Sequence, residues 1–298
     1  MTAPLDQITT LVLPRAAGGT LADAAQALGL TDATILSPGR AIEGRSNATD
    51  SADAKAILDA ARVEADVCVQ PSGNRRRRVL VCDMDSTLIG EECIDELADF
   101  AGVKAQVSEI TERAMRGEIG FEGALEARVA LLEGLPIDVL QRCFDDRIHI
   151  NPGARALART MRANGAKTLI VSGGFTFFTE RIAEACGFES HQANTLIEAE
   201  GALTGRVGHP ILGREAKLDA LLAACDGKAS RALAIGDGAN DLAMIQAAGL
   251  GLAFHAKPAV IAASHSAITC TDLHTALYFQ GYTDAEIALD DSDQPLSA

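Results

Sequence analysis

The stretch VLVCDMDST, residues 79–87, decides the fold class. Its first four residues are apolar, a run that is typical of a buried parallel strand. Two carboxylates, Asp83 and Asp85, follow where the chain leaves the sheet. Their mutual repulsion makes a simple capped turn the weaker interpretation. A divalent cation such as Mg²⁺ would relieve it, so that one carboxylate could act as ligand and nucleophile and the other as acid and base.

Further apolar runs follow this stretch and predict a sheet of parallel strands. Helical segments separate them, which favours a doubly wound α/β fold with ligands bound beyond the carboxyl ends of the strands. Asn151 and Pro152 predict the start of a helix that ends near Gly165. The remaining expected strands are 168–171, 232–235, 249–254 and 267–270.

Two insertions are expected at the edge of the sheet where the site should lie. About 85 residues separate the first two strands, far more than one crossover needs, and their periodicity predicts a helical cap over about 90–150. Residues 195–207 alternate around Glu200 and Gly201 as a hairpin does. Both are candidate lids over the site.

The ends of the chain differ from its centre. Residues 1–78 predict a small α+β domain with strands at 9–13 and 65–70 and helices at 21–28 and 52–63. It ends in four arginines, 75–78, which favour a solvated linker over a nucleic-acid patch. Residues 79–298 form the main domain, and its acidic end, 284–298, is expected to fray.

Charge and composition exclude several classes of protein. The 298 residues hold 26 basic and 41 acidic side chains, a net charge of −15, which argues against binding nucleic acid or an anionic membrane. Residues 1–78 hold nine of each sign, so the whole excess lies after Arg78. Seven scattered cysteines and the absence of a signal or membrane-spanning run predict a cytoplasmic protein with reduced thiols. The six histidines show no ligand spacing.

Three more elements at strand ends carry candidate chemistry. Residues 236–241, GDGAND, place Asp237 and Asp241 at the mouth of the sheet as further metal or supporting carboxylates. Residues 172–174, SGG, are either an anion cradle or an ordinary turn. Lys217 is expected to open a helix over 218–224, where a cation is unfavourable unless it faces an anion.

In this order the four elements resemble the motifs of the haloacid dehalogenase superfamily over residues 79 to about 275. The cap is similar to that of its phosphoserine phosphatases, through EECIDE at 91–96, MRG at 115–117, Phe121 and EARVALL at 126–132. The resemblance implies an Mg²⁺-dependent hydrolase that releases L-serine and phosphate from O-phospho-L-serine, the last step of serine biosynthesis, through an aspartyl-phosphate. On their own, Glu92 and Arg128 would be taken for surface charges.

The resemblance also assigns roles to residues. Asp83 would be the nucleophile and Asp85 the acid and base, while Asp83, the Asp85 carbonyl and Asp237 would bind Mg²⁺ and Asp241 would support its waters. The residues implied to contact the substrate are Glu92 at the ammonium, Arg128 at the carboxylate, Met115 and Phe121 as a cover, Ser172, Gly173 and Lys217 at the phosphoryl group, and Asn240 in the lining.

Two alternatives to this hydrolase stay open. The phosphoryl group could pass to another amino-acid hydroxyl, since water and an alcohol attack the same intermediate. Alternatively, the chain could be a serine-sensing regulatory protein, against which the intact Asp83, Asp85, Lys217 and Asp237 speak. The position of residues 1–78 resembles that of ACT-type amino-acid-sensing domains, which leaves serine feedback, homodimer contacts or a structural remnant as their role.

Overall fold

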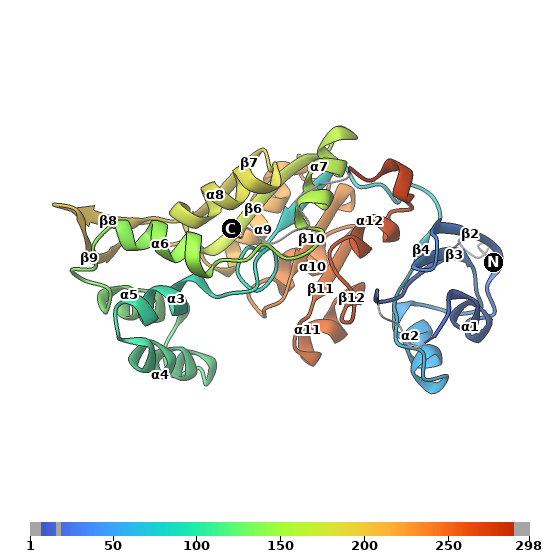
Figure 1. The fold of residues 1–298 in the computed structure, drawn as a ribbon, viewed down its shortest axis with the longest axis horizontal. Helices are drawn as coiled ribbons and strands as arrows, with labels where there is room; N and C mark the ends of the chain where they lie inside the picture. The colour runs from blue at the N-terminus through green and yellow to red at the C-terminus, as the bar shows by residue number, and fades with distance from the viewer. Residues whose placement is uncertain (1–6, 16–18, 289–298) are drawn as a thin grey trace.

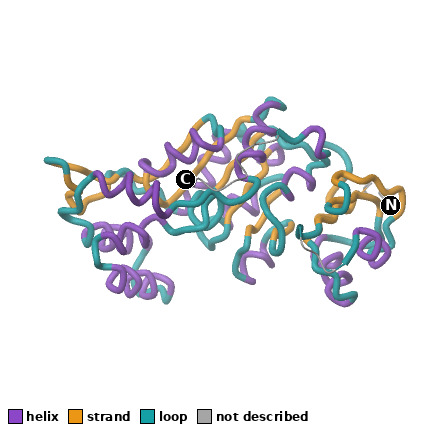
Figure 2. The backbone as a smooth tube through the Cα atoms, in the orientation of Figure 1, coloured by secondary structure: helices purple, strands orange, loops and turns teal. Residues whose placement is uncertain are grey.

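The computed structural model describes residues 7–15 and 19–288, which form a small N-terminal domain, a central sheet with helices on both faces and a helical cap (Figure 1). The N-terminal domain and the cap lie at opposite ends of the molecule. Figure 2 shows the strands of the central sheet enclosed between helices, and a separate group of strands at the N-terminal end. The described part contains no helix long and apolar enough to cross a bilayer.

The central sheet has six parallel strands in the order β12-β11-β10-β5-β6-β7. This confirms the predicted doubly wound fold and adds β7, a polar edge strand that carries no apolar run in the sequence. The strands are β5 (Val79–Cys82), β6 (Lys167–Phe175), β7 (Ser190–Asn194), β10 (Ala232–Gly236), β11 (Leu250–Phe254) and β12 (Ser266–Ile268).

Helices pack on both faces because successive strand residues point in opposite directions. Leu80 joins the larger apolar core with Leu157 of α7, whereas Val81 joins a second core with Leu221 of α9. The helices of this domain are α7 (Ala154–Ala163), α8 (Thr176–Cys186), α9 (Arg214–Ala224), α10 (Leu242–Ala247), α11 (Pro258–Ala263) and α12 (Thr275–Phe279), with 3₁₀ turns η1 (Ala229–Arg231) and η2 (Asp284–Glu286).

The cap lies beyond the carboxyl end of β5. Its entering and leaving segments pair through a bridge between Ile89 and Ile150. The predicted hairpin is confirmed and belongs with the cap, because the Gly134 N–H donates to the Leu203 carbonyl at 2.8 Å. The elements are α3 (Cys93–Phe100), α4 (Lys104–Met115), α5 (Phe121–Ala130) and α6 (Asp138–Arg147), with β8 (Leu196–Ala199) and β9 (Ala202–Val207) in the hairpin.

The N-terminal domain is an antiparallel sheet in the order β2-β3-β1-β4, with α1 and α2 adding to its apolar core. Its β4 lies against β12 of the central sheet. The sequence indicated four of its six elements and missed the hairpin of β2 and β3. The elements are β1 (Gln7–Val12), α1 (Leu21–Ala27), β2 (Thr31–Ser37), β3 (Ala41–Arg45), α2 (Ser51–Ala60) and β4 (Asp66–Pro71).

Two expected helix starts are wrong. Helix α7 begins at Ala154 after Gly153, whose positive φ of 84° starts the helix, while the Asn151 side chain donates to the Thr87 carbonyl at 2.8 Å instead of capping. Helix α9 begins at Arg214, so Lys217 is its fourth residue and does not open it.

Two segments expected to be solvated are held by the protein. Arg75 forms an ion pair with Glu43, and Arg77 donates to the Gly249 carbonyl at 2.9 Å. The arginine segment is therefore bound to the protein surface, and the expectation of a solvated linker is wrong. The expectation of fraying is wrong for residues 284–288, since the Ala288 N–H donates to Thr160 Oγ1 at 2.8 Å. Residues 289–298 lie outside the described part.

The cysteines agree with the prediction of reduced thiols. None of the seven, all of which lie in the described part, forms a disulfide, and six of them are buried. The six buried cysteines belong to the apolar cores, as small apolar side chains do.

Candidate active site

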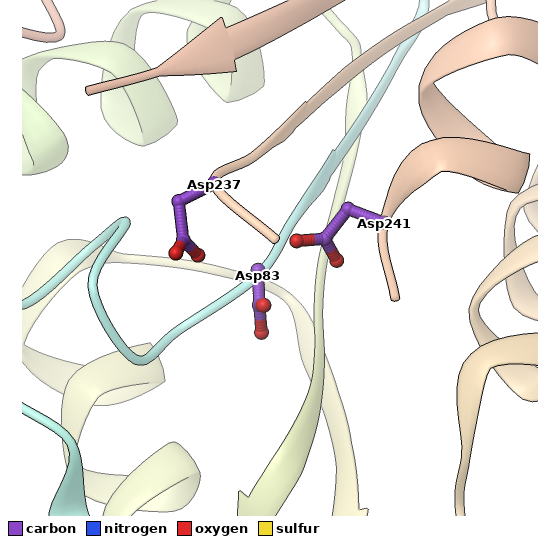
Figure 3. A group of neighbouring side chains, drawn as sticks. All are labelled: Asp83, Asp237 and Asp241. Atoms are coloured by element: carbon purple, nitrogen blue, oxygen red, sulfur yellow. The ribbon is translucent and has the colours of Figure 1, made fainter. Parts of the chain in front are cut away.

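Three aspartates meet where β5 and β10 end. These strands are paired in parallel, with Cys82 opposite Ile235, so the residues that follow them, Asp83 and Asp237, leave the sheet at the same edge. Asp241 is the residue directly before α10. In Figure 3 Asp83 lies between Asp237 and Asp241. One oxygen from each carboxylate lies within 4.8 Å of the others, a spacing that a single cation could bridge.

Lys217 partly neutralises this cluster. Its ammonium lies 2.6 Å from Asp83 Oδ2 and 2.6 Å from Asp241 Oδ1, and its side chain is 1% exposed. Burial alone would lower the pKa of Lys217, but the charges of Asp83 and Asp241 outweigh it and raise the pKa. Burial and the negative charge of Asp241 hold the pKa of Asp83 well above its usual range. The site therefore carries more negative charge than one lysine can compensate.

The three carboxylates are not equivalent as ligands. Asp241 is fully buried, and its two oxygens already accept from the Lys217 ammonium and, at 3.0 Å, from the Gly238 N–H. Asp237 is half-buried, and its carboxylate accepts a long hydrogen bond, 3.3 Å, from Thr87 Oγ1. Burial and the charge of Asp241 raise its pKa to about 6. These hard oxygens fit a divalent cation held directly by Asp83 and Asp237 and supported by Asp241.

Asp85 points away from this cluster toward the cap. Its Oδ1 accepts from the Cys93 N–H of helix α3 at 2.9 Å, and its Oδ2 accepts from Ser172 Oγ at 3.1 Å. Burial raises the pKa of Asp85. A carboxyl group that retains a proton more readily than usual, next to Asp83, suits a general acid.

The glycines after Ser172 allow the chain to pass close to Asp85. The pairing of β6 with β7 is interrupted between Val171 and Phe175, and within this break the Gly174 N–H donates to Ser172 Oγ at 2.8 Å. A Cβ on Gly174 would stand 2.5 Å from Asp85 Oδ2, so only glycine fits. The segment is the irregular end of β6, and α8 begins directly after it at Thr176.

Asp83, Asp85 and Asp237 line a cleft of about 380 Å³ between the sheet and the cap. The cap closes over it through Phe121, whose ring would touch a Cβ on Gly173 at 3.2 Å. Nine of the sequence-predicted residues line this cleft: Asp83, Asp85, Glu92, Phe121, Arg128, Ser172, Gly173, Asp237 and Asn240. Lys217 and Asp241 lie behind the lining, and the side chain of Met115 is outside the described part.

The cap brings one acid and one base to the cleft. Glu92 accepts from Ser86 Oγ at 2.7 Å. Although Glu92 remains accessible to solvent, its enclosure by the cleft and the charge of Asp85 raise its pKa to about 7. Arg128 donates to the Ala124 carbonyl at 3.2 Å and has no ion pair among the described residues. Both groups therefore have capacity for a ligand of opposite charge.

Several lining residues were missed from the sequence. Thr111 and Ala114 lie three residues apart on α4, and Ala124 precedes Arg128 by one turn of α5, so the helical period could have found them once one cap residue was known. Thr87 belongs to the quoted DMDST stretch, but its bond to Asp237 depends on strand pairing. The remaining residues that line the cleft are Ile94, Ile119, Leu125, Gly174 and Phe175.

Known proteins are similar to this chain in sequence and in fold. The sequence model of haloacid dehalogenase-like hydrolases matches residues 80–246. A phosphoserine phosphatase of Streptomyces coelicolor is 45% identical over 78% of this chain and 58% of its own length. One of Archaeoglobus fulgidus is 46% identical over 70% and 62%. The chain thus spans about 60% of the length of these two relatives.

A solved structure matches nearly the whole chain. The unliganded probable phosphoserine phosphatase of Vibrio cholerae superposes with a TM-score of 0.75 at 32% identity, over 95% of this chain and 88% of its own. The match therefore extends beyond the main domain into the N-terminal one.

Proposed function

Because the chain belongs to the haloacid dehalogenase-like hydrolase family, we propose that it hydrolyses O-phospho-L-serine to L-serine and phosphate. One observation supports the choice of substrate: Glu92 and Arg128 of the cap line the same cleft as Asp83 and Asp85. An amino acid presents an ammonium and a carboxylate, and a planar guanidinium matches a carboxylate with two parallel hydrogen bonds. Two relatives that are 45% and 46% identical to this chain over the aligned residues are named phosphoserine phosphatases.

The protonation of Glu92 supports recognition of an ammonium. With a pKa near 7, Glu92 is only partly charged in the empty cleft at neutral pH. An ammonium placed beside it would lower that pKa and restore the charge, which couples binding to the positive group of the substrate. A phosphate ester without an amino group would lose this interaction.

The reaction would proceed in two steps at Asp83. A carboxylate oxygen of Asp83 forms a bond to phosphorus as the bond from phosphorus to the serine oxygen breaks, and Asp85 gives its proton to that oxygen. Asp85 then takes a proton from water as the water oxygen bonds to phosphorus, which releases phosphate and restores Asp83. Lys217, Ser172 and the Gly173 N–H would compensate the negative charge of the phosphoryl oxygens.

Mg²⁺ is the cofactor that we propose, with Asp83, the Asp85 carbonyl and Asp237 as its protein ligands. Oxygen ligands and a shortage of positive charge in the cluster support this choice. When bound, the cation would neutralise developing charge on the phosphoryl oxygens. We also propose that the protein works in the cytoplasm, where seven cysteines that form no disulfide remain reduced.

The decisive experiment is a substrate panel with and without Mg²⁺. Phosphate release is measured for phosphoserine, phosphothreonine and a sugar phosphate. We expect phosphoserine to give the highest kcat/KM and chelation of the metal to abolish turnover. Equal rates on the three esters would contradict the substrate, and full turnover in chelator would contradict the metal.

A matched pair of substrates tests the role of Arg128. Arg128→Gln should lower kcat/KM for phosphoserine about 10- to 100-fold, because the carboxylate loses a charged bidentate partner. Phosphoethanolamine lacks that carboxylate, so its slower turnover should not change. Equal losses on both substrates would show that Arg128 supports the cleft and does not read the carboxylate.

A further inference from the structure

A second hollow lies at the amino-terminal ends of β5 and β10, whereas the cleft lies at their carboxyl ends. Its volume is about 930 Å³, within the size range of pockets for small ligands. Its lining contains no acidic side chain and five arginines. The lining residues are Ser72, Asn74, Arg75, Arg76, Arg77, Arg78, Ser230, Arg231, Gln280 and Gly281.

The register of the sheet brings two of these arginines together. Arg78 directly precedes β5 and Arg231 directly precedes β10. These strands are paired in parallel with Val79 opposite Ala232, and the Arg78 N–H donates to the Arg231 carbonyl at 2.8 Å. Since Asp83 is the fifth residue after Arg78, the hollow is about 16 Å along the strand from the aspartate cluster.

Three of the five arginines have no acidic partner among the residues that the structure describes. Arg75 and Arg76 are neutralised by Glu43 and Glu286. In the part of the chain that the structure describes, neither Arg77 nor Arg78 nor Arg231 forms an ion pair. The rest of the lining adds no negative charge, so a net positive hollow exists in a protein whose net charge is −15.

The contacts that these three arginines do make leave many donors unused. Arg77 donates to the carbonyls of Ser230 and Gly249, yet its Nε is shielded from solvent and has no acceptor in the described part. Arg78 makes one long bond, 3.3 Å, to the Asn164 carbonyl. Arg231 is exposed and no side-chain contact is found for it within the described ranges. A guanidinium has five N–H donors, so the hollow offers a surplus of them.

We propose that this hollow binds a small anion that carries two or more phosphate groups. Guanidinium groups match phosphate oxygens with paired hydrogen bonds, and three unneutralised arginines call for more negative charge than one phosphate supplies. Both a nucleoside diphosphate and inorganic diphosphate have this chemistry. The distance along β5 separates this anion from the phosphoryl group in the cleft, so the two bind without competition.

Calorimetric titration with diphosphate tests the site. It is done in chelator, where the uncompensated aspartates of the cleft repel phosphate. We expect saturable binding of one diphosphate per chain, weakened at least about tenfold in Arg78→Gln/Arg231→Gln, because each lost charged contact is worth about that factor. Two controls should bind as the wild type does: Arg206→Gln, an exposed arginine elsewhere, and Arg128→Gln in the cleft.

Further arms identify the source of the phosphate groups and protect the test from misfolding. ADP that binds more tightly than diphosphate would support a nucleotide ligand, and equal affinities would support recognition of phosphates alone. Arg231→Glu alters an exposed side chain that makes no hydrogen bond or ion pair within the described ranges, and it should lower affinity at an unchanged melting temperature. Three results would overturn the proposal: no saturable binding by the wild type, full binding by the double variant, or a loss confined to Arg128→Gln.

Discussion

Two groups of aspartates in this protein differ in how far their negative charge is compensated. Asp66 lies at the contact between the N-terminal domain and the central sheet, where its oxygens accept from the N–H groups of Thr269, Cys270 and Thr271 and from both threonine hydroxyls. In the cleft Asp83 and Asp241 share one lysine. The first carboxylate is saturated with donors, and the second group lacks positive charge.

The pKa values express the same contrast. Burial alone would raise the pKa of Asp272, a second acid at the domain contact, but hydrogen bonding and charge from His274, together with Arg40, lower it to about 2. Burial and a like charge raise the pKa of Asp237 to about 6. An acid that is saturated with donors stabilises the folded protein, whereas crowded acids that lack positive charge destabilise it. The following variants test that division, from the largest expected effect to the smallest.

Asp83→Asn should lower kcat by about three orders of magnitude or more, because an amide cannot form the aspartyl-phosphate. Removal of one negative charge from a crowded cluster should leave the metal-free protein equally stable or more stable. Phosphate release and thermal unfolding in chelator measure the two effects. Substantial turnover by the variant would contradict the role of Asp83, and a large loss of stability would contradict the contrast with the domain contact.

Lys217→Met should lower kcat about 10²- to 10³-fold, because the phosphoryl oxygens lose a positioned cation. Unlike Asp83→Asn it should also destabilise the metal-free protein, since Asp83 and Asp241 lose their shared partner. Lys228→Met, at an exposed lysine, is the control for both measurements. If Lys217→Met were as stable as this control, the repulsion inferred in the cluster would be wrong.

Asp66→Asn should cost about 2 to 4 kcal/mol of unfolding free energy, because an amide NH₂ group would face donors of the 269–271 loop. Turnover should stay within about twofold of the wild type, since Asp66 does not line the cleft. Asp59→Asn removes an exposed ion pair in α2 and should change stability by less than about 0.5 kcal/mol. Denaturant unfolding and phosphate release compare the three proteins.

Asp272→Asn tests the sign of the pH dependence. Because the folded-state pKa of Asp272 is depressed to about 2, its contribution is present above pH 4 and is lost as the pH falls from about 4 to 2. We expect the variant to be about 2 kcal/mol less stable at pH 7, with a difference that shrinks in acid. Urea unfolding between pH 2 and pH 7 measures it. A difference independent of pH would mean that the charge of Asp272 does not stabilise the contact.

Local patterns predicted five of the six strands of the central sheet and nine of the residues that line the cleft. An apolar run followed by DMDST, and a second followed by GDGAND, predict strands whose ends carry acids, because parallel strands place their carboxyl ends at one edge. The helical cap followed from its length and period. Residues 1–78 contain no ligand motif, so the sequence does not choose between serine feedback, dimer contacts and a structural remnant. Their role stays a prediction.

Contacts between distant segments decided the rest. The strand β7 carries polar residues at the edge of the sheet, so no apolar run marked it, and Asn151 was expected to cap a helix but bonds to Thr87, 64 residues away. Arg75–Arg78 resembled a solvated linker because a run of like charge contains no information about its partners. Sequence therefore determined which side chains stand at the strand ends and on the cap, and nine of the predicted residues line the cleft. Only the tertiary structure decided which of those charges are neutralised, because the neutralising groups come from other elements brought near by packing.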